Sequence, residues 1–290
     1  MAGKRKKHSA DLLAGIIVIL VAILLMVAVV IGFRQCTALL PVPSVVPTAP
    51  PTTAPTQPPK PTLAKNPYSA ADFGYNDNGY LTCLSGESWL GVDVSEHQGS
   101  INWEKVAATE VQFAMVRLAY RGWGSEGLVR PDARGLENLD GAAAAGLQVG
   151  VYFFSQAITV EEAIEEARFL LELLDGRALD MPVVFDWETV SSEEARTANM
   201  NRKTLNACAM AFCQEIEAAG YQAMLYYNLD MAKWKFDLLP FQEAGYEFWL
   251  AMYTDRMNYS YRVRMWQYTN QGRVDGIKGR VDLNLYFPGP

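Results

Sequence analysis

From residue 90 onward, the chain repeats a short apolar run, rich in β-branched and aromatic residues, that ends in polar or acidic residues. Helical patterns separate the earlier runs, whereas the last three runs follow each other through loops. Alternating strands and helices with almost continuously apolar strands are typical of a parallel sheet covered by helices. The sequence therefore predicts an α/β fold in which eight strands close into an irregular TIM-like barrel with about five helices. The predicted strands cover residues 90–94, 113–119, 148–154, 182–185, 222–227, 247–252, 263–268 and 281–286.

Capping signals mark the starts of two predicted helices. Asn102 precedes the first helix, and Thr159 and Glu162 form a capping box for an amphipathic one. The predicted helices cover residues 103–108, 132–145, 160–174, 193–219 and 231–234.

The net charge of -7 is distributed unevenly along the chain. The first 34 residues carry +4, which leaves -11 for the remainder, and an acidic folded part argues against a nucleic-acid binder. Residues 12–33 form an uncharged apolar run of 22 residues, enough at about 1.5 Å per residue to cross about 30 Å of hydrocarbon. We therefore predict a basic segment at 1–11 and a transmembrane helix at 12–33.

A cleaved signal peptide is the alternative interpretation of this run. Its apolar region is typically shorter, roughly 7 to 15 residues, and is followed by a small-residue cleavage site that we do not find here. The basic cluster at residues 4–7 lies directly before the span. By the positive-inside rule, the N-terminus is expected in the cytoplasm and the remainder of the chain outside.

A proline-rich stretch follows, in which nine of the 21 residues from 41 to 61 are proline. Such a sequence cannot pack a core and favours an extended polyproline II conformation of about 3.1 Å per residue. We predict an extracellular linker at 34–62, a lead-in segment at 63–89 that packs against the domain, and the barrel domain at 90–290. A flexible tether, the alternative for the linker, differs only in stiffness.

Four acidic residues lie at the ends of predicted strands: Asp93, Asp186, Glu188 and Asp282. Because residues two apart in a strand share a face, Asp186 and Glu188 point together while Trp187 points away. Two carboxyl groups crowded in a partly apolar pocket cannot ionise independently, so the pKa of one rises. Glycoside hydrolysis uses such a pair, one acid to protonate the leaving oxygen and one carboxylate to stabilise or attack the anomeric carbon.

Two other interpretations of these acids remain. A single Asp at a strand end is often a solvated loop residue or a helix cap. Clustered carboxylates also bind magnesium or calcium, although no phosphate-binding glycine loop accompanies them here.

Several segments carry a family resemblance. The first is GVDVSEHQGSINW, and it continues through MVRLAYRGWGSEG, GLQVGVYFFSQA, PVVFDWE, YYN and MWQYTNQGRVDGIKGRVDLNLY, over about residues 90–287. These segments are similar to the glycoside hydrolase family 25 lysozymes, the Chalaropsis-type muramidases. The resemblance implies a β-barrel with five helices. It also implies cleavage, with net retention, of the β-1,4 bond between N-acetylmuramic acid and N-acetylglucosamine.

By position, the resemblance implies that Glu188 is the general acid/base and Asp186 its partner acid. Asp93 and Asp282 match the acids of the first and last strands. Direct attack by an Asp and assistance to the substrate's own acetamido oxygen both remain open, and the second route would use Asp186 to orient the acetamide. One departure is Phe153, where many relatives have His, and we expect it to alter a substrate contact while sparing the acids.

Polar and aromatic residues at strand ends are candidates for sugar contacts. We predict that the substrate-binding residues are Arg117, Tyr152, Tyr226, Trp266 and Gln267. Because Arg117 lies inside an apolar strand, we also expect it to pair with one of the acids, either as support for the site or as a core ion pair.

Together these features predict a peptidoglycan muramidase, anchored in a bacterial cell membrane as a single-pass protein with its catalytic domain facing the cell wall. A non-catalytic wall-binding module and a docking scaffold are the alternatives. No cofactor, metal site or nucleic-acid partner is expected, and the oligomeric state is left open. Cys208 and Cys213 are expected to be packed thiols, whereas a bridge between Cys36 and Cys83 is left open.

Overall fold

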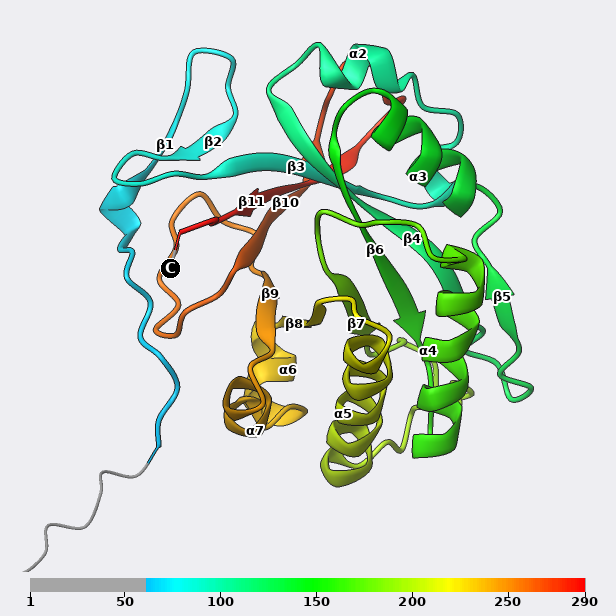
Figure 1. Ribbon diagram of the computed structural model, residues 1–290. Helices are drawn as coiled ribbons and strands as arrows, with labels where there is room; N and C mark the ends of the chain where they lie inside the picture. Colours follow the sequence, from blue (N-terminus) through cyan, green and yellow to red (C-terminus); the bar gives the residue numbers. More distant parts are fainter. Residues whose placement is uncertain (1–60, 290) are drawn as a thin grey trace, which may run out of the picture. The chain divides into compact units, whose positions relative to one another are not determined.

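The structure, a computed structural model, describes residues 61–289, and within them eight strands close into a barrel (Figure 1). The pairing of β3 with β4 joins the two ends of the sheet. A short additional strand, β5 (Val129–Pro131), pairs with the end of β4 outside the ring. The prediction of an eight-stranded α/β barrel is confirmed. The barrel strands are β3 (Trp89–Val94), β4 (Val111–Arg121), β6 (Gln148–Ser155), β7 (Val183–Trp187), β8 (Ala223–Asn228), β9 (Glu247–Ala251), β10 (Met265–Gly272) and β11 (Val281–Tyr286).

The last strand runs against the others. The strands from β3 through β10 pair in parallel around the ring, but β11 is antiparallel to both of its neighbours, β10 and β3. The expectation of an all-parallel sheet is therefore wrong for β11, because a hairpin rather than a crossover connects it to β10. The reversal brings the start of β11 to the barrel end where the parallel strands finish. There Asp282 lies opposite Asp93 in the register.

Side chains of alternate residues fill the barrel interior and the layer between the sheet and its outer cover. Phe113, Met115, Met224 and Trp249 belong to the interior cluster and are fully or almost fully buried. Gly91 faces the same interior, and a Cβ atom there would lie 2.2 Å from the Phe113 ring. Glycine at this position is therefore required by the packing of the barrel.

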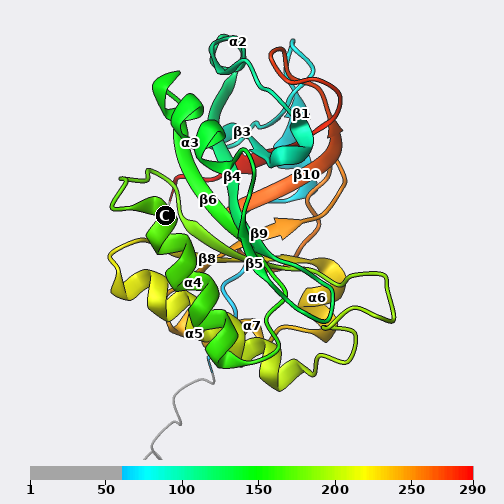
Figure 2. The same cartoon turned by 90° about the vertical axis from the view of Figure 1, so that its right-hand side faces the viewer.

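Helices cover much of the outer face, and α4 and α5 lie side by side against it (Figures 1 and 2). Within residues 61–289 there are six α-helices, close to the predicted number, together with two short 3-10 helices. They are α2 (Trp103–Ala107), α3 (Gly135–Ala144), α4 (Val160–Leu174), α5 (Arg202–Ala218), α6 (Leu229–Trp234), α7 (Leu238–Glu243), η1 (Ala70–Asp72) and η2 (Glu96–Gln98).

The predicted caps of α2 and α4 are present. The Asn102 side chain accepts from the Lys105 N–H at 3.0 Å, and the Thr159 hydroxyl accepts from the Glu162 N–H at 3.3 Å. The capping box is altered, since the Glu162 carboxylate accepts from the N–H of Ile158, at 2.8 Å, and not from that of Thr159.

Two helix predictions need correction, and one helix was missed. α5 begins at Arg202 rather than at residue 193, because the Asn201 side chain accepts from the Thr204 N–H at 2.9 Å and caps the helix there. The residues before it, 188–200, form turns that bury Thr197. α3 begins at Gly135 instead of residue 132, and α7 was not predicted.

The lead-in segment packs on the outer face of the late strands. Its two short strands, β1 (Phe73–Tyr75) and β2 (Leu81–Cys83), form a hairpin. The Phe73 ring contacts the rings of Trp266 and Phe287, with centroid distances of 5.1 and 6.1 Å. This hairpin thus buries the side of β10 that faces away from the barrel interior.

Among residues 61–289, no helix is both long and apolar enough to cross a membrane. The predicted basic segment, the predicted transmembrane helix at 12–33 and the linker up to residue 60 lie outside the described residues, as does Cys36. Cys208 and Cys213 are buried thiols on α5, as predicted.

Substitution of Gly91 by alanine tests the packing of the barrel interior. The added Cβ overlaps the Phe113 ring, so we expect Gly91→Ala to lower the free energy of unfolding by about 2 kcal/mol or more. Gly124→Ala is the matched control, because a Cβ there meets nothing within 4 Å. Urea unfolding of both variants measures the difference, and equal stabilities would contradict the close approach at Gly91.

Candidate active site

All four predicted acids gather at one end of the barrel. Asp93 lies near the end of β3, Asp186 lies on β7, Glu188 follows β7 directly, and Asp282 lies at the start of β11. Asp93 and Asp186 are each only 6% exposed, and the other two are partly buried. The four acids therefore lie together, as predicted, although Asp282 lies at the start of β11 and not at its end.

Asp93 is held by two side-chain amides. Its Oδ2 accepts from Gln267 Nε2 at 2.9 Å and from Asn284 Nδ2 at 2.8 Å. Trp249 Nε1 donates to Asn284 Oδ1 at 2.9 Å, which orients that amide. The Gln267 amide is oriented in the same way, since its Oε1 accepts from the hydroxyls of Tyr253, at 3.0 Å, and Tyr226, at 3.2 Å.

These contacts influence the pKa of Asp93. Burial raises its pKa, and the amide donors and Asp282 oppose that rise by hydrogen bonding to the carboxylate. Asp282, directly opposite, has its pKa raised from 3.8 to about 8, first by burial and then by the negative charge of Asp93. The pKa of Asp93 remains above its ordinary value, but because its charge raises the pKa of Asp282, Asp186 and Glu188, Asp93 is the first of the four acids to ionise.

Asp186 and Glu188 form the second half of the site. Burial, then the charges of Glu188 and Asp93, raise the pKa of Asp186 well above its usual value, and Arg117 lowers it in part. Burial and the charge of Asp93 also raise the pKa of Glu188. Among the described residues, the buried Oδ1 of Asp186 has no hydrogen-bond partner. The crowded pair thus has the raised pKa that proton donation at neutral pH requires.

Two predicted substrate residues, Tyr152 and Tyr226, line the barrel interior beneath the acids. Both rings make edge-to-face contacts with Trp249, with centroid distances of 6.1 and 5.0 Å. Burial, and then the nearby negative charges that include Asp186 and Asp93, raise the pKa of both hydroxyls.

Arg117 takes different partners from those expected. Its Nε donates to Asp132 Oδ2 at 2.7 Å, and its NH2 donates to Glu96 Oε1 at 3.2 Å. In the described structure, none of the four site acids forms an ion pair with it. Its effect on the site is the long-range one on the pKa of Asp186.

Trp266 and Phe153 do not reach the site. Trp266 is adjacent to Gln267 in β10 and therefore faces the outer layer, where its Nε1 donates to the Met252 carbonyl at 2.8 Å. The Phe153 ring packs against Phe212 of α5. The departure at Phe153 therefore affects the outer core and not a substrate contact.

Three residues of the site were not among those predicted: Asn284, Trp249 and Tyr253. Asn284 has a sequence signal, because it follows Asp282 by two residues and so shares its face of β11. Trp249 and Tyr253 act through the amides that they orient, and such contacts across strands leave no local pattern. No group of His, Cys, Asp or Glu within residues 61–289 has the geometry of a metal site.

Comparisons with known proteins agree with this geometry. The sequence model of Glycosyl hydrolases family 25 matches residues 92–277. The chain is 28% identical over 210 residues to Uncharacterized protein YegX of Escherichia coli, a match covering 68% of each protein. It is 24% identical over 200 residues to Autolytic lysozyme of Clostridium acetobutylicum, covering 69% of this chain and 56% of the relative. The family match confirms the resemblance and the predicted enzyme class, glycoside hydrolase.

Among solved structures, the modular autolysin LytC of Streptococcus pneumoniae has a TM-score of 0.60 at 24% identity, over 78% of this chain and 52% of LytC. This chain therefore spans about half the length of LytC, and the likeness shows a shared fold. LytC has also been solved in complex with a synthetic peptidoglycan ligand.

The raised pKa of Asp282 predicts how stability depends on pH. Because its pKa is higher when folded, Asp282 contributes stability that is full below about pH 4 and is lost as the pH rises through about 8. Asp282→Asn keeps a neutral donor toward Asp93 at every pH. We expect the variant to gain stability relative to the wild type by on the order of 4 kcal/mol between pH 5 and pH 9, because about three pH units of this range lie below the folded pKa of Asp282. Urea unfolding at both pH values measures this, and identical pH profiles would contradict it.

Proposed function

Since the chain belongs to Glycosyl hydrolases family 25, we propose that it is a peptidoglycan muramidase. It hydrolyses the β-1,4 bond between N-acetylmuramic acid and N-acetylglucosamine with net retention. The observation that carries this proposal is the pair of Asp186, which is buried, and Glu188, which is partly buried, whose pKa values are both raised by burial and by the charge of the neighbouring Asp93. Such a group supplies both a proton for the leaving oxygen and negative charge for the developing oxocarbenium ion.

Glu188 acts as the general acid/base. It is more exposed than Asp186 and stands where the strand ends, so it is the carboxyl that a glycosidic oxygen reaches first. Protonation of that oxygen leaves Glu188 ionised, and the carboxylate then activates the water that completes hydrolysis.

Asp186 orients the acetamido group of the substrate. Its buried Oδ1 lacks a partner among the described residues, and a substrate acetamide N–H is the kind of donor that would satisfy it. This favours attack by the acetamido oxygen over direct attack by an Asp. Tyr226 and Gln267 lie in the same part of the site, where the Tyr226 hydroxyl donates a hydrogen bond to Gln267 Oε1.

A cleft that borders the site at Tyr253, and that none of the four acids lines, supports an extended glycan as the substrate. It has a volume of about 560 Å³ and shares Tyr253 with the site. The lead-in hairpin contributes Tyr75, which is 60% exposed, and Asn78 to its lining. Exposed aromatic rings beside polar groups suit sugar rings, and LytC has been solved with a synthetic peptidoglycan ligand.

We further propose that the enzyme is anchored in a bacterial cell membrane with its catalytic domain facing the wall. The support is the apolar run at 12–33 behind a basic cluster, followed by a proline-rich spacer.

The products of wall digestion test the muramidase proposal. We expect the purified full-length chain to release fragments whose new reducing ends are N-acetylmuramic acid, detected as N-acetylmuramitol after borohydride reduction. N-acetylglucosamine ends alone would show a glucosaminidase, free amino groups an amidase, and binding without release a non-catalytic module. Glu188→Gln should lower kcat by about 1,000-fold and leave wall binding intact. Glu172→Gln, an exposed acid on α4, is the matched control and should keep full activity.

A further inference from the structure

A fully buried amide, that of Gln156, touches the backbone of Glu188. Trp187 is the last residue of β7, so Glu188 lies beyond the strand. Gln156 Nε2 donates to the Glu188 carbonyl at 3.1 Å and to the Ser155 carbonyl at 2.9 Å. The side chain of Gln156 therefore ties the residue after β7 to the end of β6.

The oxygen of the same side-chain amide accepts a hydrogen bond from Thr197. The Thr197 hydroxyl donates to Gln156 Oε1 at 2.7 Å, and both residues are buried, at 4% and 0% exposure. Two carbonyl oxygens face Nε2 and can only accept, so the orientation of the amide is determined. Gln156 thus joins the two ends of the turn segment 188–200, which contains both Glu188 and Thr197.

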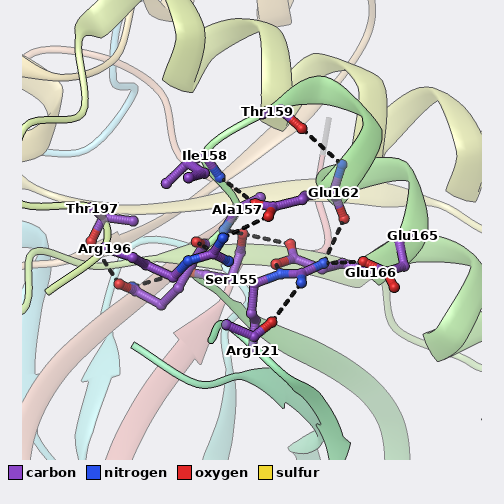
Figure 3. A network of polar contacts seen from close by, with 12 residues as sticks. Arg121, Ser155, Ala157, Ile158, Thr159, Glu162, Glu165, Glu166, Arg196 and Thr197 are labelled. Carbon is purple, nitrogen blue, oxygen red and sulfur yellow. Dashed lines mark hydrogen bonds and ion pairs between the residues drawn. The ribbon is translucent and has the colours of Figure 1, made fainter. Parts of the chain in front are cut away.

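Arg196 ties this segment down a second time. Its NH1 donates to the Gln156 carbonyl at 3.3 Å. Its NH2 donates to Glu162 Oε1 at 2.6 Å (Figure 3). A Cβ at Gly127 would lie 2.2 Å from Arg196 NH1, and the positive φ of +55° at Gly127 also favours glycine. The packing of this arginine therefore depends on the loop that follows β4.

An ion pair beneath these contacts anchors Ser155. Arg121 Nε donates to Glu166 Oε1 at 2.7 Å, and the Ser155 hydroxyl donates to Glu166 Oε2 at 2.6 Å (Figure 3). Both charged side chains are almost completely buried. Breaking one half of a buried ion pair is costly, so Glu166 is held firmly and holds the Ser155 hydroxyl in turn. The Ser155 carbonyl that accepts from Gln156 is therefore in a well-defined place.

We propose that Gln156 and Thr197 are positioning residues that hold Glu188 in the orientation needed for proton transfer. The inference rests on the proposed role of Glu188. Neither residue faces the substrate. They act through the Glu188 backbone. The Glu188 carbonyl lies beyond the last residue of β7, and the hydrogen bond from Gln156 holds it in place. A displacement of about 1 Å in a catalytic group can cost about 100-fold in rate, so the loss of these bonds has a kinetic effect.

A pair of variants at Thr197 tests the proposal. Thr197→Val keeps the shape and removes the hydroxyl, whereas Thr197→Ser keeps the hydroxyl and removes a methyl group. We expect Thr197→Val to lower kcat on purified walls by about 10-fold with KM changed less than twofold, and Thr197→Ser to stay within twofold of the wild type. Gln156→Met, which keeps the length but cannot donate, should lower kcat by about 10- to 100-fold.

Three outcomes would overturn the positioning role: wild-type kcat in Thr197→Val and Gln156→Met, a rise in KM in place of a fall in kcat, or an equal loss in Thr197→Ser and Thr197→Val. The Thr197 pair decides the question even if Gln156→Met does not fold. The wild-type protein separates this proposal from the proposed function. If it releases no N-acetylmuramic ends, the muramidase assignment fails, whereas an active wild type with unaffected variants rejects the positioning role alone.

Discussion

The antiparallel pairing of β11 with β3 brings the carboxyl groups of Asp282 and Asp93 face to face at a buried end of the barrel. Burial and then the charge of Asp93 raise the pKa of Asp282 to about 8, so Asp93 ionises before Asp282 does. The charge of Asp93 then raises the pKa of Asp186 and of Glu188. The reversed strand therefore adds to the effect of burial, which is the largest cause of the raised pKa values in the site.

Neutral donors, rather than cations, stabilise the charge on Asp93. Gln267 and Asn284 donate to it and are themselves oriented by Tyr226, Tyr253 and Trp249. An arginine in the same place would lower the pKa of every neighbouring carboxyl. Arg117 instead pairs with Asp132 and Glu96. The site can therefore hold one ionised carboxylate beside acids that still carry a proton, which is the condition for acid catalysis.

This arrangement is costly for folding, and the surrounding structure offsets the cost. Buried carboxyl groups with raised pKa values destabilise the folded state at neutral and alkaline pH. The closed ring of strands and the interior packing around Phe113 and Gly91 hold these groups together. The Arg121–Glu166 ion pair, between β4 and α4, and the Gln156 side chain hold the segment that begins at Glu188.

Much of the barrel and all four acids were predictable, because apolar runs and the two-residue alternation are local features. The direction of β11 was not predictable, because the alternation of side chains in a six-residue strand is the same whether the strand runs parallel or antiparallel to its neighbours. Trp266 was misplaced because its face depends on sheet register, and the same register brings the adjacent Gln267 inside. The start of α5 was missed because Asn201, not the helical pattern before it, ends the turn segment. The contacts of Gln156 join three separate segments and have no local signature.

The central claim is that Asp93 and Asp282 share one proton while the protein is folded. Carbon-13 NMR of side-chain carboxyl groups, followed from pH 3 to pH 10, measures this directly. The account predicts one Asp carboxyl that titrates at about 8 and disappears in Asp282→Asn. If no Asp carboxyl that titrates near 8 is lost in Asp282→Asn, the account is contradicted.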